Sequence, residues 1–126
     1  MTAALYDYVA AHNTPLPPVL EALRQSIIRY FPQHHLMTPV PTIKLLMLLA
    51  KIQRPQVVMD VGSFAGFSAL ALAMGAGPQA RVHTCDKDDQ PIQHGRPYWE
   101  RAKMTNRIIF HHGAALEILD ILHEAG

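Results

Sequence analysis

An apolar run that leads into an acidic residue and a glycine turn is the clearest chemical feature of this sequence. Residues 57–59 are apolar, Asp60 follows them, and Gly62 and Gly66 come next. The pattern is typical of a buried parallel strand, and ligands bind at the carboxyl ends of such strands. Gly62 allows a ligand to approach the backbone closely, and Gly66 allows the next helix to begin tightly.

Two further signals stand at the ends of the next apolar runs. Asp86 follows residues 81–85, where a carboxylate can accept hydrogen bonds from both ribose hydroxyls of a nucleoside. Small residues at 113–115 follow the third run and leave room for an adenine ring. A simple strand-to-helix connection explains any one signal equally well. Three signals at successive strand ends favour a ligand site.

The spacing of the glycines indicates which kind of nucleoside ligand the site binds. It is G-x-x-x-G and not the G-x-G-x-x-G that gathers backbone amides around a pyrophosphate. Asp60, two residues before the first glycine, is a poor neighbour for an anion and a good one for a cationic amino-acid group. The pattern therefore favours S-adenosylmethionine (SAM) over a nicotinamide dinucleotide.

Alternating elements are expected to position these residues. Hydrophobic periodicity predicts helices over 3–11, 19–30 and 42–52, with Thr38 or Thr42 capping the last of them. Strands at 57–59, 81–85 and 108–110 then alternate with helices at 67–74, 91–104 and 114–123, and Asp88 and Asp89 are candidate caps. This order implies an α/β fold with a parallel sheet. The first strand is expected between the second and either the third or a neighbour outside this chain.

Composition narrows the class of protein. A chain of 126 residues that is 49% hydrophobic and 17% charged can build one domain. The net charge of +1 gives little support for a nucleic-acid partner. One cysteine, Cys85, excludes an internal disulfide and fits a reducing compartment. The longest apolar run, 45–50, is short for a membrane span, and the N-terminus does not resemble a signal peptide. A cytoplasmic protein without a membrane partner is expected.

Other reactive side chains have structural interpretations. The adjacent histidines at 34–35 and 111–112 would point to opposite faces of a strand, so neither pair forms a chelate alone, and no metal site is expected. Cys85 is interpreted as a small buried hydrophobic residue. Tyr98 and Trp99 are interpreted as packing residues and not as a substrate stack.

The sequence resembles the cation-dependent O-methyltransferases, the family of caffeoyl-CoA and catechol O-methyltransferases and their bacterial relatives. The resemblance rests on residues 37–39, 45–46, 48–49, 58–71, 96–102 and 113–117, in the order that the family has them, and residues 5–8 and 20–24 resemble its entry helices. It implies a Rossmann-like SAM-methyltransferase fold, here with a partial parallel sheet of three strands and N-terminal helices. Residues 1–52 would be a helical segment on the lid and substrate side, and residues 53–126 the first half of the SAM-binding domain.

The resemblance also implies roles at the methionine end of the donor. The backbone of Met37 and Thr38 would line it. Asp60, which stands where the family usually has Glu, would hold the ammonium group, directly or through a water. The turn around the methionine would consist of Gly62, Ser63 and Phe64. The hydroxyl of Ser68 would bind the donor's carboxylate.

At the adenosine end, the resemblance implies that Asp86 binds the ribose and that Lys87 stacks near the adenine. Gly113, Ala114 and Ala115 would border the adenine ring. Thr42-Ile43 replaces the Gly-Gln that many members carry on the substrate side.

The family's metal-binding aspartates and its lysine would follow residue 126, so no catalytic or metal-binding residue is assigned to this chain. We expect it to be part of a longer enzyme, inactive alone, with a divalent cation (Mg²⁺) only in the full-length protein. An open sheet edge favours a homodimer. The acceptor is expected to be a small catechol-like phenol. Alternatives are a tRNA hydroxyuridine, a NAD(P)-binding domain and a non-catalytic binding module.

Overall fold

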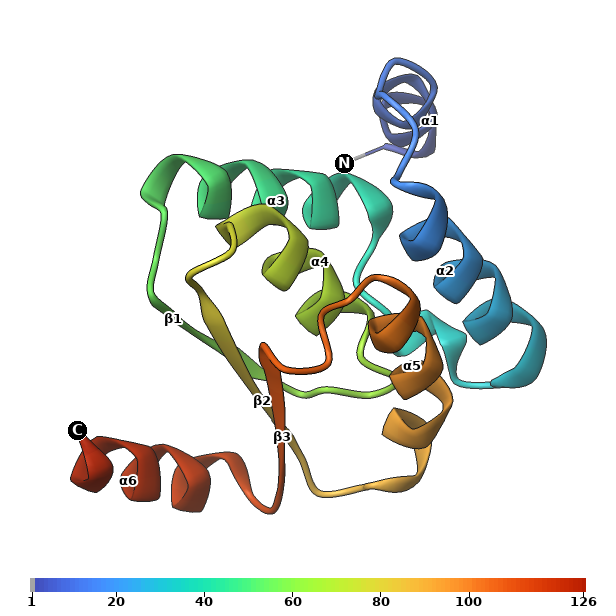
Figure 1. Ribbon diagram of the computed structural model, residues 1–126. Helices are drawn as coiled ribbons and strands as arrows, with labels where there is room; N and C mark the ends of the chain where they lie inside the picture. The colour runs from blue at the N-terminus through green and yellow to red at the C-terminus, as the bar shows by residue number, and fades with distance from the viewer. Residues whose placement is uncertain (1) are drawn as a thin grey trace.

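A three-stranded parallel sheet with helices on both faces forms the centre of the computed structural model, which describes residues 2–126 (Figure 1). The elements in chain order are α1 (Ala3–Ala11), α2 (Pro18–Tyr30), the 3₁₀ turn η1 (His34–Leu36), α3 (Val40–Gln53), β1 (Val57–Val61), α4 (Phe67–Ala76), β2 (Arg81–Asp86), α5 (Gln90–Arg101), β3 (Ile108–His112) and α6 (Ala115–Ala125). The expected α/β architecture with N-terminal helices is confirmed, and the predicted boundaries are close to these.

The strand order decides between the two placements expected for the first strand. The sheet has the order β1-β2-β3, so β1 does not lie between β2 and β3, and the placement beside a neighbour outside this chain is the one that stays a prediction. Two right-handed crossovers whose helices lie on the same face move the chain in one direction across the sheet, which places β1 at an edge. Within residues 2–126, β1 pairs with β2 on one side and with no strand on its other side. In the parallel register Asp60 lies opposite Thr84 and Asp86 opposite His112, so the carboxyl ends of the strands meet at one edge.

The start of α3 corrects one expectation, because neither Thr38 nor Thr42 caps it. The N-cap is Pro39, which makes no side-chain hydrogen bond, and a second proline follows within the first turn. Proline at a helix start fixes φ near the helical value and lacks an N–H that would have no partner there. The two prolines therefore begin the helix at Val40, two residues earlier than the pattern predicts.

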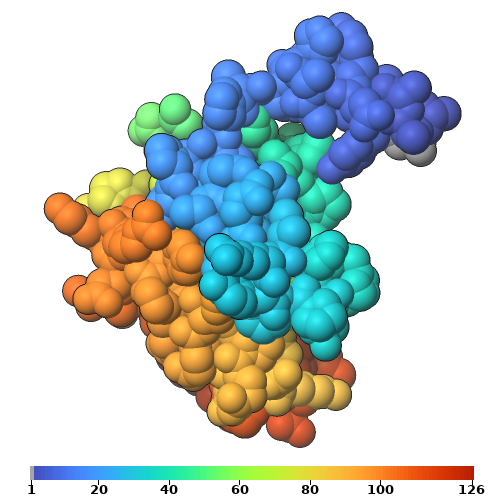
Figure 2. Space-filling model, turned by 90° about the vertical axis from the view of Figure 1, so that its right-hand side faces the viewer, coloured from blue at the N-terminus to red at the C-terminus, as the bar shows by residue number. Residues whose placement is uncertain are grey.

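The main core lies between one face of the sheet and helices α4 and α5, with α2 and α3 packed outside them. Trp99 on α5 is fully buried there, which confirms it as a packing residue, and Cys85 is also buried. Figure 2 shows α2 and α5 side by side on one surface, with α1 projecting beyond them. Helix α6 lies alone on the opposite face of the sheet (Figure 1).

Apolar side chains remain exposed on several elements. Val57 and Val61 on the edge strand and Leu116 and Ile121 on α6 are more than half exposed, so the open edge that the sequence predicts is present. A continuous segment, His34–Gln53, is long and apolar enough by length and composition to cross a membrane, which the shorter run 45–50 did not reveal. In this fold the segment is interrupted between η1 and α3, and α3 packs against α4.

Candidate functional site

The turn between β1 and α4 has the backbone of a binding loop. Gly62 and Gly66 have φ of 90° and 80°, and Phe64 between them has φ of 46°. The N–H groups of Gly62 and Ser63 both donate to the carbonyl of Cys85, at 2.9 and 3.0 Å, which ties the turn to β2. A Cβ placed on Gly62 would meet no atom within 4 Å. Open space therefore faces this glycine, as close approach of a ligand requires.

Helix α5 holds the other side of the turn. The indole N–H of Trp99 donates to the carbonyl of Gly66 at 3.1 Å. A Cβ on Gly66 would lie 2.6 Å from the Trp99 ring, and one on Gly95 would lie 1.9 Å from the carbonyl oxygen of Ala65. At both positions the neighbouring atoms lie so close to the glycine that any side chain would clash with them. The turn is therefore held between β2 and α5.

Asp60 lies in a network of hydroxyl groups beneath the turn. Its carboxylate accepts hydrogen bonds from Thr84 at 2.8 Å and from Ser68 at 3.1 Å to each oxygen. The hydroxyls of Ser63 and Thr84 lie 2.6 Å apart. Burial raises the pKa of Asp60, the two hydroxyl donors oppose this, and the charge of Asp86 raises it further. Two neighbouring carboxylates at one strand edge favour a positively charged ligand.

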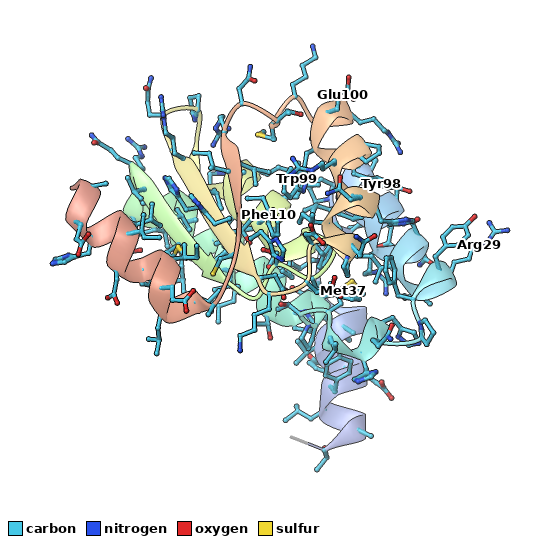
Figure 3. The ribbon with its side chains drawn as sticks, turned by 90° about the horizontal axis from the view of Figure 1, so that it is seen from below. Arg29, Met37, Tyr98, Trp99, Glu100 and Phe110 are labelled. Atoms are coloured by element: carbon cyan, nitrogen blue, oxygen red, sulfur yellow. The ribbon has the colours of Figure 1, made fainter. Side chains whose placement is uncertain are left out.

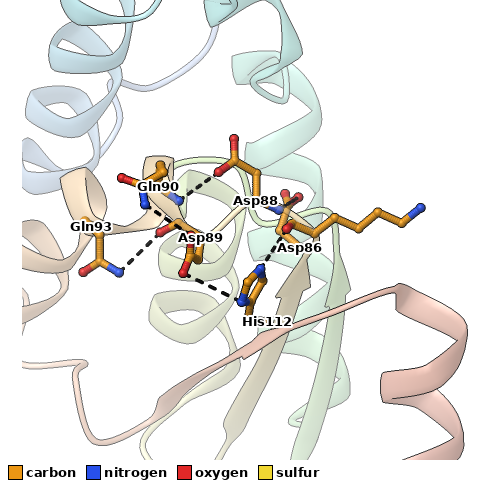
Figure 4. A network of polar contacts seen from close by, with 7 residues as sticks. Asp86, Asp88, Asp89, Gln90, Gln93 and His112 are labelled. Atoms are coloured by element: carbon orange, nitrogen blue, oxygen red, sulfur yellow. Dashed lines mark hydrogen bonds and ion pairs between the residues drawn. The ribbon is translucent and has the colours of Figure 1, made fainter.

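Asp86, at the end of β2, uses part of its hydrogen-bonding capacity on the backbone. One carboxylate oxygen accepts a hydrogen bond from the N–H of Phe64 at 2.9 Å. The other accepts one from the N–H of Asp88 at 3.1 Å (Figure 4). Because a carboxylate has about four acceptor positions, two remain for a ligand. The side chain lines a cavity together with Gly62 and Phe64.

Two cavities meet at the turn, since they share Leu36, Gly62 and Phe64. The larger has about 580 Å³ and is lined by Phe31, Gln33, Leu36, Gly62, Phe64, Asp86, Asp88, Gln90 and Pro91. The smaller has about 20 Å³ and is lined by Leu36, Met37, Thr38, Gly62, Ser63, Phe64, Phe67 and Ser68. The larger volume lies within the range of small-molecule sites.

Most residues that the sequence predicts for the donor site come together around these cavities. Asp60 is the first exception, because it lies behind Ser68 and lines neither cavity. The residues predicted on the adenine side, Lys87 and 113–115, also line neither cavity. The N–H of Gly113 donates to the carbonyl of Asp86 at 2.9 Å, and His112 contacts the carbonyl of Lys87 at 2.8 Å (Figure 4). These contacts hold the segment beside the end of β2.

Sequence reasoning missed the residues that the loop after α2 contributes, namely Phe31, Gln33 and Leu36. Prolines mark this segment as a loop, but its closure over the strand ends is a tertiary event without a local signal. Asp88 was expected as a helix cap, and its carboxylate does accept a hydrogen bond from the N–H of Gln90 at 3.0 Å. It also lines the larger cavity, while Asp89, the N-cap residue of α5, makes no capping bond.

A metal ion has no evident binding site in the described part of the chain. Residues 2–126 contain no group of three or more His, Cys, Asp or Glu side chains that could hold one. His83 and His111 do approach each other, with Nδ1 and Nε2 3.0 Å apart. Their ring planes are within 14° and their centroids are 5.2 Å apart, so the two nitrogens point directly at each other. That geometry fits one shared hydrogen bond and leaves no space for an ion between them.

Comparison with known proteins yields one family. A family model described as O-methyltransferase matches residues 10–126. The catechol O-methyltransferase domain-containing protein 1 of Mus musculus is 34% identical over 122 residues, which are 97% of this chain and 46% of that protein. Caffeoyl-CoA O-methyltransferase 2 of Petunia hybrida is 28% identical over 125 residues, 98% of this chain and 51% of that protein. The chain spans about half the length of the curated relatives it matches.

Solved structures share the fold. An O-methyltransferase from Bacillus cereus in complex with S-adenosylhomocysteine (SAH) superposes with a TM-score of 0.80 at 27% identity, over 96% of this chain and 55% of that one. The SAH-bound methyltransferase PaMTH1 of Podospora anserina superposes with a TM-score of 0.84 at 20% identity, over 92% of this chain and 50% of that one. The second similarity concerns the fold alone.

Proposed function

Because the chain belongs to the O-methyltransferase family, we propose that the protein containing it transfers a methyl group from SAM to a hydroxyl of a small phenolic, catechol-like acceptor. The observation that carries the proposal is the pair of joined cavities at the carboxyl ends of β1 and β2. They surround the open space at Gly62 and place the carboxylate of Asp86 at the wall of the larger one.

The geometry suggests how the donor would lie. The larger cavity is of a size for the adenosine part, and the free acceptor positions of Asp86 suit the two ribose hydroxyls. The methionine part would lie along the open space at Gly62, with its ammonium end toward Ser68. The hydroxyl hydrogen of Ser68 is directed at Asp60, so it is not available for the donor's carboxylate, the role that the resemblance implies. The Ser68 oxygen can instead accept a hydrogen bond from the donor's ammonium group. Asp60 then compensates the positive charge from behind Ser68.

In the transfer itself, the bond between the methyl carbon and the sulfonium sulfur breaks while a bond to the acceptor oxygen forms. The sulfonium becomes a neutral thioether, and the hydroxyl proton leaves to a base. The residues described here bind and orient the donor, which supplies part of the rate enhancement. They form no metal site, so we assign them no role in holding a divalent cation.

A NAD(P)-binding oxidoreductase domain is the rival class. The turn lacks G-x-G-x-x-G, and the carboxylate of Asp60, two residues before Gly62, would repel a pyrophosphate. The test is to express the protein from its complete reading frame and to measure methyl transfer from radiolabelled SAM to catechol and to undermodified tRNA, with and without Mg²⁺. Methylated catechol is expected. Transfer to tRNA alone would select the tRNA acceptor, and transfer to neither would contradict the proposal.

A further inference from the structure

A column of ring side chains connects helices α2 and α5 to the wall of the donor pocket. Phe31, the C-cap residue of α2, lines the larger cavity. Its ring centroid lies 5.1 Å from that of His94 on α5, with the planes at 87°, and 5.2 Å from that of Phe64, with the planes at 68°. Both contacts have the edge-to-face geometry that aromatic rings prefer. Phe31 is thus held between His94 and the pocket turn.

His94 is itself held by both helices. Its Nε2 lies 2.6 Å from the hydroxyl oxygen of Ser26 on α2. The rings of Tyr30 and Tyr98 lie 5.6 and 6.2 Å from it, centroid to centroid. In Figure 3, Tyr98 lies on α5 where that helix faces α2. The position of the imidazole ring is therefore determined by a hydrogen bond on one side and by aromatic contacts around it.

A nucleophilic role for the Ser26–His94 pair does not fit this geometry. Catalytic pairs of this kind need a third group that orients the histidine. No hydrogen bond to Nδ1 of His94 occurs within residues 2–126, and Ser26 lies in the middle of α2. The contact fixes a position and offers no activated oxygen.

The segment that follows Phe31 supplies much of the donor pocket. Gln33 and Leu36 line the larger cavity, and Leu36, Met37 and Thr38 line the smaller one. This segment is attached at its start through Phe31 and at its end through the first turn of α3. Loss of the attachment at Phe31 would free one end of the wall that covers both cavities.

We propose that His94 is a positioning residue for the methyl-donor pocket, acting through Phe31 on the loop of residues 33–38. This inference rests on the proposed function, in that the ligand is the donor. Without the His94 ring, Phe31 loses one of its two edge contacts and the loop spends less time closed. The apparent dissociation constant then rises in proportion to the loss of the closed population.

The test compares His94→Leu, His94→Phe and Ser26→Ala with wild type. Ile108→Val, a buried substitution at the start of β3, is the control for a general loss of stability. SAH affinity is measured by calorimetry at a temperature at which every variant is folded. Amide hydrogen exchange over residues 33–38 is measured in the free proteins.

We expect His94→Leu to weaken SAH binding about tenfold and to speed exchange in residues 33–38. Ser26→Ala should change both quantities in the same direction but less, and His94→Phe, which restores an edge-on ring, should recover most of the affinity. Ile108→Val should change neither. Wild-type affinity and wild-type exchange in His94→Leu would overturn the inference, as would faster exchange spread evenly over the chain. If wild type does not bind SAH, the proposed function fails, and exchange alone decides the role of His94.

Discussion

The carboxylate of Asp86 accepts a hydrogen bond from the backbone N–H of Phe64 at 2.9 Å, which joins the end of β2 to the turn after β1. Phe64 has a positive φ of 46°, so this bond helps to hold an uncommon backbone conformation. One side chain thus shapes the turn and also presents free acceptor positions to the larger cavity.

Replacing this carboxylate should damage donor binding most. We expect Asp86→Ala to weaken SAH binding about ten- to hundredfold, because hydrogen bonds to a charged group contribute about 1.5–3 kcal/mol. Asp120→Asn removes the same charge from the exposed side of α6 and should leave the affinity unchanged. Calorimetric titration of both variants decides the matter, and equal affinities would refute the ribose-binding role.

Asp60 should make stability depend on pH. Since its pKa is raised by burial, the folded protein holds this proton more tightly than the unfolded chain. The stabilisation is complete below about pH 4 and is lost as the pH rises through the raised pKa. The Asp60→Asn side chain cannot ionise. The free energy of unfolding of this variant should therefore increase relative to that of wild type as the pH rises from about 4 to about 7. Urea unfolding at several pH values measures the difference, with Asp120→Asn as the control. A constant difference would show that Asp60 is not desolvated.

His83 should make stability depend on pH in the opposite direction, because its pKa is lowered. Burial lowers its pKa, and the charges of His111 and Arg81 lower it further. Its stabilising contribution is present above the ordinary value of about 6.5 and is lost as the pH falls through the lowered pKa. We expect His83→Gln to unfold with a weaker pH dependence than wild type between about pH 7 and pH 5. His123→Gln, on the exposed end of α6, should keep the wild-type dependence. Parallel curves for the two variants would argue against a lowered pKa of His83 in its contact with His111.

The close packing of α5 on the turn should appear as coupling between Gly66 and Trp99. A Cβ at Gly66 would need both a left-handed backbone and space that the indole occupies. We expect Gly66→Ala to cost about 2–4 kcal/mol of unfolding free energy. The cost should fall by about 1 kcal/mol or more in a Trp99→Phe background, where the smaller ring leaves room. Additive costs in a double-mutant cycle would mean that the ring does not limit this position.

Local patterns were sufficient for the elements and for the turn residues. Apolar runs ending at Asp60 and Asp86 predict where strands stop, and parallel pairing then brings those ends together without further information. The pattern does not determine on which side of β2 the third strand lies, so it left open whether β1 lies between β2 and β3. It also does not show that Ser68 would direct its hydroxyl at Asp60, or that Phe31 would close one cavity. Both depend on packing between segments far apart in the chain.

The ligand selectivity of residues 1–126 shows whether the strand ends around Gly62 and Asp86 form a methyl-donor pocket. A ligand that binds only the folded state at about 100 times its dissociation constant stabilises the protein by about 2.7 kcal/mol, so the melting temperature should rise. We expect SAM and SAH to raise the melting temperature and NAD at equal concentration to leave it unchanged. A rise with NAD alone, or no rise with either SAM or SAH, would contradict the assignment of a methyl-donor pocket.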